Sequence, residues 1–456
     1  MSSIVKKIIP VIFLCLSYLF AYAQEVNKMT LPKVIAYALE HSPEIKIAHL
    51  NIEDAKQQIT ETKSTGLPQI NAEVTYNHFF ELPVSVLPSA FEEIIRIGNG
   101  GDLPPDFSNQ IAFGLRNNFQ AGINLRTMIF DGSFFTGLRA AELLRNLRQE
   151  ELDAKQQLLE SQVIEAYLPA IIIRENIKIL DKNIKNVNKL LQETEALYKE
   201  GFVEQLDVDR LDLSLANLNT ERESLENQYK QAINNLKMII RYPVNQDLTL
   251  SDLEDWRTII IPVTAEDLTG PVNYYQRKNY KAAETGIQLN DLNIEYTKKR
   301  YLPTINLNAS YNQAYQGDRL FNDPNSFWAP TGIVGLSLNI PIIDGFGKQS
   351  KIERAQIASD IARVQQAQLT HLIDVEVANT RIQYKNATKR LESQEKNLAL
   401  AERIFNTTQI KYREGVGSSL EIVQAEQSLF DTQRNYTQAL FDVLTAKLDL
   451  YRALGK

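Results

Sequence analysis

The sequence contains little cysteine. Only one of its 456 residues is cysteine, Cys15, and this residue lies in a segment with the layout of an exported leader. Two lysines precede an apolar run at residues 8–20, and a small-x-small tripeptide follows at residues 21–23. This order is typical of a secretory signal peptide, so we expect residues 1–23 to be removed on export. The mature chain then has no cysteine for a disulfide or a metal site.

The mature sequence also lacks long apolar runs and an excess of positive charge. No stretch after the leader approaches the roughly 20 apolar residues that a membrane-spanning helix needs. If the mature chain enters a membrane, it therefore does so as strands. The formal net charge is −7, which argues against nucleic acid as a partner.

Residues that carry common catalytic chemistry are scarce. The four histidines show no compact metal-ligand spacing; they are His41, His49, His78 and His371. The sequence has neither a phosphate-binding Walker motif nor the Gly-x-Ser-x-Gly turn that carries an esterase nucleophile. We therefore expect no catalytic residues, no metal site, no cofactor and no enzyme activity.

The sequence is internally duplicated, because three segments recur in the same order. The matching pairs are LPQINAEVTYN at 67–77 with LPTINLNASYN at 302–312, AGINLRTMIFDG at 121–132 with VGLSLNIPIIDG at 334–345, and YKEGFVEQLDVDRLDL at 198–213 with YREGVGSSLEIVQAEQ at 412–427. The period is far longer than that of a solenoid repeat. We therefore expect two copies of one architecture, at residues 28–242 and 268–455, joined by an equatorial linker at residues 243–270.

Each copy contains two segments with the period of a two-faced strand. In the first copy, apolar and polar residues alternate from Ile70 to Tyr76, and the second copy repeats the pattern at the matching positions. Alternation with period two predicts strands that have one apolar and one polar face. We expect these strands within residues 67–131 and 302–344.

The stretches between the paired strands are rich in Pro, Gly, Asn and Asp. They cover residues 81–118 and 316–331, and the first includes the sequence GNGGDLPPD. This composition predicts loops, and we expect the first loop to be mobile.

Glycine is absent from residues 138–200 and 348–414, so each stretch is expected to form one helix of about 65 to 70 residues, roughly 100 Å long. In the first helix, apolar residues from Ile173 to Tyr198 follow spacings of four and three, which predicts a left-handed coiled coil. Pro169 is expected to kink this helix. In total, helical segments are expected at residues 31–66, 132–242, 271–301 and 345–455.

Gly201 and Gly415 occupy matching positions where a long helix has to stop. Glycine at such an end can take the left-handed conformation that caps the last turn. Each copy is therefore expected to contain a helical hairpin that reverses at this glycine.

Four strands in one chain are too few for a closed membrane barrel, for which about eight is the minimum. An open sheet in lipid would leave unsatisfied backbone groups at its edges. Several chains are therefore expected to share one barrel. Two chains or three would satisfy this argument, and the residues do not choose between them.

The order of these features resembles that of the TolC-like outer membrane factor family, which forms bacterial efflux and secretion ducts. The resemblance rests on a Leu-Pro strand, a loop, a strand ending in Asp-Gly, a long helix, a Tyr-x-x-Gly turn and a return helix, all present twice. It implies a mainly α-helical chain with a membrane β-barrel portion. Three chains would form a homotrimer, with a twelve-stranded barrel in the cell outer membrane and a twelve-helix coiled-coil tunnel in the periplasm.

The resemblance also implies partners and a docking site. The partners are outer-membrane lipid, a periplasmic adaptor (a membrane fusion protein) and an inner-membrane pump of the RND, ABC or MFS type. The hairpin turns would form the periplasmic tips that the adaptor contacts. The residues expected there are Gly201, Phe202, Val203, Gly415, Val416 and Gly417.

A pore constriction is expected just past the turns. The resemblance implies that a carboxylate at the position of Glu421 lies in the pore and that a second follows three residues later, where this sequence has Gln424. Asp207 matches Glu421 in the first copy. Ser418 and Glu421 also form a capping-box pattern, so capping is an alternative role for Glu421. At the first turn the matching residue is Glu204, whose side chain is a poor cap. A capping role is therefore less expected for Asp207 than for Glu421.

Tyr198 and Tyr412 begin the two turn motifs and continue the apolar stripes of their helices. Packing is the plain interpretation of both residues, and shaping of a closed tip is the alternative.

With Gln424 in place of a carboxylate, the constriction is expected to trap cations less strongly.

These inferences predict a passive outer-membrane duct, gated at its periplasmic tips and opened by an adaptor coupled to an inner-membrane pump. The alternative is a secreted coiled-coil structural or adhesive protein, which the long helices alone would satisfy. That alternative leaves the four two-faced strands unexplained. A periplasmic hydrolase is a third possibility, but the sequence offers no site for it.

Overall fold

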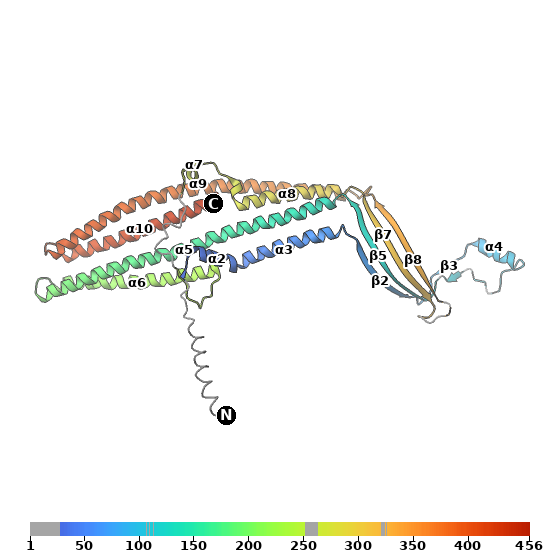
Figure 1. Ribbon diagram of the computed structural model, residues 1–456, viewed down its shortest axis with the longest axis horizontal. Coiled ribbons are helices and arrows are strands. Elements are labelled where there is room, and N and C mark those ends of the chain that lie inside the picture. Colours follow the sequence, from blue (N-terminus) through green and yellow to red (C-terminus); the bar gives the residue numbers. More distant parts are fainter. Residues whose placement is uncertain are drawn as a thin grey trace, which may run out of the picture. The chain divides into compact units, whose positions relative to one another are not determined.

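The computed structural model describes residues 28–105, 107–108, 110–112, 114–250, 263–320, 324 and 326–456 (Figure 1). The signal peptide expected at residues 1–23 lies outside the described residues. The chain divides into two compact units, which we call the helical unit and the sheet unit. The helical unit comprises the chain up to Glu53, Asn146–Gly286 and Ala362–Lys456, and the sheet unit comprises Asp54–Arg145 and Ile287–Ile361.

Four antiparallel strands form the main sheet of the sheet unit, in the order β2-β5-β7-β8 (Figure 1). Their bounds are Gln69–His78 for β2, Asn117–Asp131 for β5, Thr304–Gly317 for β7 and Phe327–Asn339 for β8. The expected strand pair is present in each copy, and β5 of the first copy pairs with β7 of the second. The two copies therefore share one sheet, whose edges within the described chain are β2 and β8.

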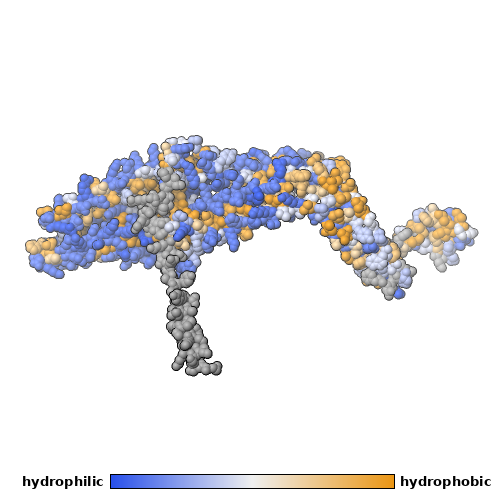
Figure 2. Space-filling model, viewed as in Figure 1, coloured by the Kyte–Doolittle hydropathy of each residue, from blue (hydrophilic) through white to orange (hydrophobic). Residues whose placement is uncertain are grey.

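The register places the apolar residues of all four strands on one face. One row across the sheet consists of Ile70, Leu125, Ala309 and Val334. Many apolar side chains of this face are exposed in the single chain, Ile70 and Val334 among them. Figure 2 shows apolar side chains gathered over these strands. This face is the one that lipid would cover in a membrane.

The first predicted loop contains regular structure, so that prediction was wrong for part of residues 81–118. The short strands β3 (Val84–Val86) and β4 (Gln110–Ala112) pair with each other, and helix α4 (Ser89–Gly98) lies between them in the chain. The loop composition concealed a short amphipathic run, FEEIIRI, that follows Pro88. In the second copy, β7 and β8 extend into the stretch that was expected to be a loop.

Two long helices and their return helices dominate the helical unit. Helix α5 (Phe134–Lys199) has 66 residues and α9 (Gly347–Arg413) has 67, which confirms the expected lengths. The return helices are α6 (Gln205–Ile240) and α10 (Ser419–Leu454), and each forms a hairpin with the long helix before it (Figure 1). Helix α5 continues through Pro169 without a break.

The predicted seam of α5 is buried against its return helix. Leu180 and Val187 of α5 pack in one cluster with Leu218 and Leu225 of α6. The alternating spacing of four and three residues therefore marks the face that joins the hairpin. The expected fold class, a mainly helical duplicated chain with a strand pair and a long hairpin in each copy, is confirmed.

Shorter elements complete the chain. They are β1 (Lys28–Met29), α2 (Leu31–His41), α3 (Pro43–Ser64), β6 (Thr249–Leu250), α7 (Ala265–Thr269), the 3-10 helix η1 (Tyr274–Gln276) and α8 (Lys278–Lys299). Strand β6 pairs in parallel with β1. The described part of the expected linker, residues 243–250 and 263–270, thus contains β6 and α7, while residues 251–262 lie outside the described chain. Within the described residues, no helix combines the length and apolar character needed to cross a membrane.

Candidate functional site

The two hairpin turns have nearly the same backbone. Gly201 follows α5 with φ of 78°, and Gly415 follows α9 with φ of 74°. In the first turn the Phe202 amide donates to the Leu197 carbonyl at 2.9 Å, and in the second the Val416 amide donates to the Lys411 carbonyl at 3.0 Å. These bonds satisfy carbonyls that the helix end leaves unpaired. The predicted left-handed glycine caps are confirmed.

The turns expose apolar side chains at matching positions. Phe202 and Val416 are each 77% exposed in the single chain. Val203 and Gly417, which follow them, are partly buried. An exposed phenylalanine and valine at the ends of two hairpins offer an apolar contact surface, but contact with an adaptor stays a prediction.

A cluster of buried apolar residues joins the two hairpins near their turns. We call it the tip cluster. It draws on α5, α6, α9 and α10 and includes Leu190, Leu191, Val208, Leu211, Phe405, Tyr412, Ile422 and Leu429. The tips are therefore packed against each other within one chain.

Polar contacts add to this packing, and the group Asp207, Arg210 and Ser419 forms what we call the cross-hairpin network. Ser419 Oγ of α10 donates to Asp207 Oδ1 of α6. Arg210 Nη1 donates to Ser419 Oγ at 3.0 Å and lies 3.8 Å from Asp207 Oδ1. The network connects the first copy to the second.

Asp207 also caps its own helix. Its Oδ2 accepts a hydrogen bond from the Glu204 amide at 3.2 Å. The expectation that Asp207 has less of a capping role than Glu421 was therefore wrong. A carboxylate at the third helical position can accept a hydrogen bond from the amide of the residue that precedes the helix. It can do so whether or not that preceding residue has a good capping side chain.

Glu421 has different surroundings from its counterpart Asp207. The Glu421 amide donates to Ser418 Oγ at 3.2 Å, so Ser418 caps α10. The Glu421 side chain is exposed, and within the described chain its carboxylate has no hydrogen-bond or ion-pair partner. Gln424 is exposed one turn further along α10. Both side chains are thus available to face a pore in an assembly, and their pore role stays a prediction.

The two matching tyrosines also differ. Tyr412 is only 7% exposed and lies in the tip cluster, and a hydrogen bond of 3.0 Å joins its Oη to Thr194 Oγ1, with either hydroxyl able to donate. Burial raises the pKa of the Tyr412 hydroxyl. Tyr198 is 43% exposed. The packing interpretation therefore fits Tyr412, while in the single chain Tyr198 remains at the surface.

Sequence reasoning missed Glu426, a buried carboxyl group near the tips. Glu426 is 5% exposed; its Oε2 accepts a hydrogen bond from Ser214 Oγ at 3.2 Å, and its Oε1 is buried without a partner. Burial raises its pKa to about 7, and the Ser214 hydrogen bond opposes this rise. The signal was present, because Glu426 follows the apolar residue Ile422 by four positions and so falls on the same helix face.

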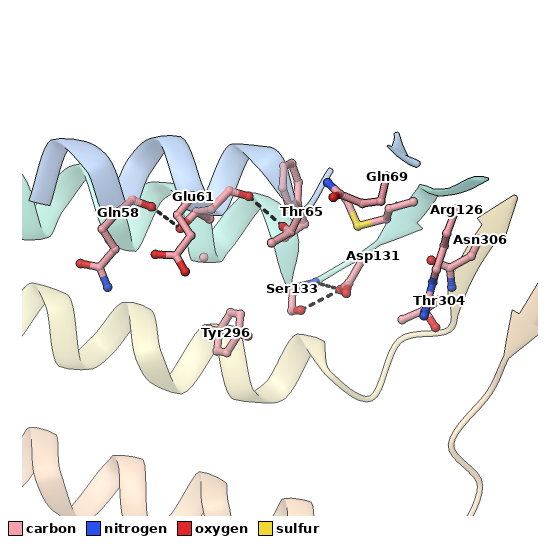
Figure 3. A pocket seen from close by; sticks show the side chains of 14 residues that line it. Gln58, Glu61, Thr65, Gln69, Arg126, Asp131, Ser133, Tyr296, Thr304 and Asn306 are labelled. Atoms are coloured by element: carbon pink, nitrogen blue, oxygen red, sulfur yellow. Dashed lines mark hydrogen bonds between the residues drawn. The ribbon is translucent and has the colours of Figure 1, made fainter. Parts of the chain in front are cut away.

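A separate cavity of about 690 Å³ lies in the sheet unit, where strands meet helices (Figure 3). Its lining is mixed and polar; the labelled residues are Gln58, Glu61 and Thr65 of α3, Gln69 of β2, Arg126 and Asp131 of β5, Ser133, Tyr296 of α8, and Thr304 and Asn306 of β7. Asp131 Oδ1 accepts a hydrogen bond from the Ser133 amide at 2.8 Å and another from the Ser133 hydroxyl at 2.7 Å. None of the sequence-predicted site residues lines this cavity. Across the described residues, no three His, Cys, Asp or Glu side chains gather as a metal site.

The described chain thus combines a sheet that has one exposed apolar face with two long helical hairpins. The chain belongs to the outer membrane efflux protein family, whose sequence pattern matches residues 106–240 and 275–456. Family membership identifies it as an efflux channel of the cell outer membrane, not an enzyme. The resemblance inferred from the sequence is therefore confirmed.

Individual proteins show the same similarity along nearly the whole chain. Outer membrane protein TolC of Vibrio cholerae is 21% identical over 434 residues, covering 93% of this chain and 90% of that protein. A crystal structure of CusC superposes with a TM-score of 0.69 at 18% identity and covers 95% of both chains. The outer membrane protein VceC of Vibrio cholerae gives a TM-score of 0.65 at 17% identity, with 93% of this chain and 96% of that chain covered.

Proposed function

We propose that the protein is the exit duct of a tripartite efflux or type I secretion system, a passive homotrimer gated at its helical tips. One observation carries the proposal. The sheet has an exposed apolar face, and its edge strands β2 and β8 have no outer neighbour within the described chain. In three copies, β8 of one chain would pair with β2 of the next to close a twelve-stranded barrel. The long hairpins would continue the barrel as a tunnel.

The edges make assembly a physical necessity if the sheet is in lipid. Each backbone group left without a partner in hydrocarbon is disfavoured by several kcal/mol, and water is not there to replace it. β2 has 10 residues and β8 has 13, so both edges are long. Closing the barrel gives both edge strands a hydrogen-bonded neighbour. The alternative of a secreted coiled-coil protein gives this sheet no role.

The proposed adaptor site is the surface of the turns. Beside Phe202 a groove of about 540 Å³ runs between α5 and the end of α9, lined mostly by apolar surface from residues that include Leu197 and Tyr412. An adaptor with an apolar tip would fill this groove and contact Val416 on the matching turn. Because the chain has no nucleotide-binding motif, the energy for transport would come from the pump.

The first prediction concerns assembly. Extraction of the mature protein from outer membranes in mild detergent is expected to yield a trimer, because only shared strands satisfy the edges of β2 and β8. Chemical crosslinking and mass photometry measure this. A monomer in the soluble fraction would contradict the proposed duct, and a stable dimer would keep the shared barrel but exclude the trimer.

The second prediction concerns the constriction. Glu421→Gln is expected to reduce the cation preference of the reconstituted channel severalfold, because it removes an exposed carboxylate from each chain. Gln424→Glu is expected to change the preference in the opposite direction. Single-channel reversal potentials in a salt gradient measure both effects. Glu414→Gln, an exposed change on the same turn, is the control. Equal reversal potentials in all variants would show that Ser418 capping is the role of this turn and that Glu421 lies outside the pore.

A further inference from the structure

Helix α4 has two chemically distinct faces. At 100° per residue, the apolar residues of its ten-residue span fall on one arc and the charged ones on the other. On the apolar arc, Phe91, Ile94 and Ile97 are 51%, 62% and 74% exposed. Glu93 and Arg96 occupy the opposite arc. Figure 2 shows the apolar character of this segment.

A helix of this length needs a surface to pack on. An isolated helix shorter than about 12 to 15 residues is marginal in water, and most helical stability in proteins comes from packing of an apolar face. The paired strands β3 and β4 extend the apolar surface, because Val84 and Val86 are also exposed. Helix α4 with β3 and β4 therefore presents an apolar face that lacks a protein partner among the described residues and is disfavoured in water.

The sheet indicates what that surface is. A row of aromatic residues crosses all four strands next to the point where the segment leaves the sheet; the cross-strand neighbours are Tyr76, Phe119, Tyr315 and Trp328. The rings of Phe119 and Trp328 lie 6.3 Å apart, and those of Tyr315 and Trp328 lie 5.2 Å apart. This row shares its face with the apolar residues of the strands. In β-structured membrane proteins such rows mark the level where lipid meets water.

The chain leaves the sheet after β2 and returns to it before β5, and both points lie next to the aromatic row. The Phe79 amide donates to the Arg116 carbonyl at 2.8 Å, one residue beyond the end of the β2–β5 pairing. The ten residues between His78 and Ser89 span at most about 35 Å when extended. Helix α4 therefore stays within reach of the boundary that the aromatic row marks.

We propose that α4 lies flat in the lipid–water interface at the outer end of the sheet, with Phe91, Ile94 and Ile97 among the acyl chains and Glu93 and Arg96 toward water. This is the arrangement of an interfacial amphipathic helix. The partner is thus a lipid surface, in continuity with the apolar face of the sheet. The proposal rests on the proposed function to the extent that the sheet spans the membrane.

Spin labels provide the test, because the mature sequence has no cysteine and each introduced one is unique. The variants are Phe91→Cys, Ile94→Cys, Ile97→Cys, Glu93→Cys and Arg96→Cys, each labelled with a nitroxide in the trimer and reconstituted into vesicles of phosphatidylethanolamine and phosphatidylglycerol. We expect relaxation by dissolved oxygen to exceed relaxation by a water-soluble nickel chelate at residues 91, 94 and 97. The reverse is expected at residues 93 and 96.

A sixth variant, Leu336→Cys on the apolar face of β8, separates the two proposals. If Leu336 is lipid-exposed and all five α4 positions favour the nickel chelate, α4 lies in water and the inference is overturned while the duct stands. Dipolar broadening at Phe91 and Ile94 would show packing among copies of α4, which also overturns it. If Leu336 itself favours the nickel chelate, the sheet is not in lipid and the proposed function fails first.

Discussion

Replacement of Asp207 by alanine is expected to open the channel. The change removes the Asp207 acceptor of the Ser419 hydrogen bond, the ion pair with Arg210 and the cap on α6. A hydrogen bond to a charged group contributes about 1.5 to 3 kcal/mol, and a cap contributes about 1 kcal/mol. The cap and the Arg210 pair lie within α6 and do not depend on the second hairpin, so only the lost hydrogen bond from Ser419 of α10 favours opening. A loss of about 2 kcal/mol from the closed state would shift the closed-to-open equilibrium roughly 30-fold. Single-channel recording in planar bilayers measures this as long-lived high-conductance openings.

Matched variants separate the cross-hairpin network from the cap. Ser419→Ala removes the same link between hairpins and leaves the bond from Asp207 to the Glu204 amide, so it is expected to open the channel to a similar extent while the cap on α6 stays in place. Glu414→Ala, an exposed change at the second turn, is expected to leave the conductance as it is. If Asp207→Ala trimers remain closed, the cross-hairpin network does not hold the gate, and packing of the tip cluster becomes the remaining explanation.

Removal of the Glu426 carboxyl group is expected to weaken a pH dependence of the tips. In the folded protein the pKa of Glu426 is raised from 4.5 to about 7 by burial. A raised carboxyl pKa means that the folded tip is most stable below about pH 4.5, where the group is protonated in both states, and loses stability as pH rises through 7. This pKa shift corresponds to a decrease of about 3 kcal/mol in the free energy of unfolding from low to high pH. Tyr412, the titratable residue of the tip cluster, has a pKa raised above its ordinary 10.0 and stays protonated over this range.

Thermal unfolding and channel opening between pH 5 and 8 measure this effect. The wild-type protein is expected to melt at lower temperature and open more often at pH 8 than at pH 5. Glu426→Gln, which keeps the shape and can still bond to Ser214, is expected to show a flatter profile in both measurements. Glu421→Gln, at an exposed position, is expected to keep the wild-type slope. Parallel slopes in wild type and Glu426→Gln would show that another group is responsible.

Several parts of the fold were accessible from local sequence alone. The absence of glycine from residues 138–200 predicted α5, and the alternating residues from Ile70 to Tyr76 predicted β2 with its apolar face. The glycine positions in the two turns predicted left-handed caps at Gly201 and Gly415, which the backbone angles confirm. Helix α4 was missed because its short apolar run is surrounded by proline and glycine. A stretch rich in these residues is predicted to be a loop from its composition.

The candidate site depended more on contacts between distant segments. Asp207 and Glu421 match in sequence, yet Asp207 is engaged by Ser419 and Arg210, while the Glu421 carboxylate has no partner in the described chain. Tyr412 is buried against Thr194, and its counterpart Tyr198 is exposed. The members of each pair occupy matching positions in the two copies, and local sequence does not show which of them is buried or paired.

By itself, the sequence determined the duplication, the two-faced strands, the long helices and the points at which they reverse. These follow from periodicity and from backbone preferences of single residues, which act over a few neighbours. Only the tertiary structure decided which titratable groups are buried or paired, including Glu426 with Ser214 and Asp207 with Ser419. Those partners are about 210 residues apart in the chain, and burial and pairing arise only when packing of the hairpins excludes water from between them.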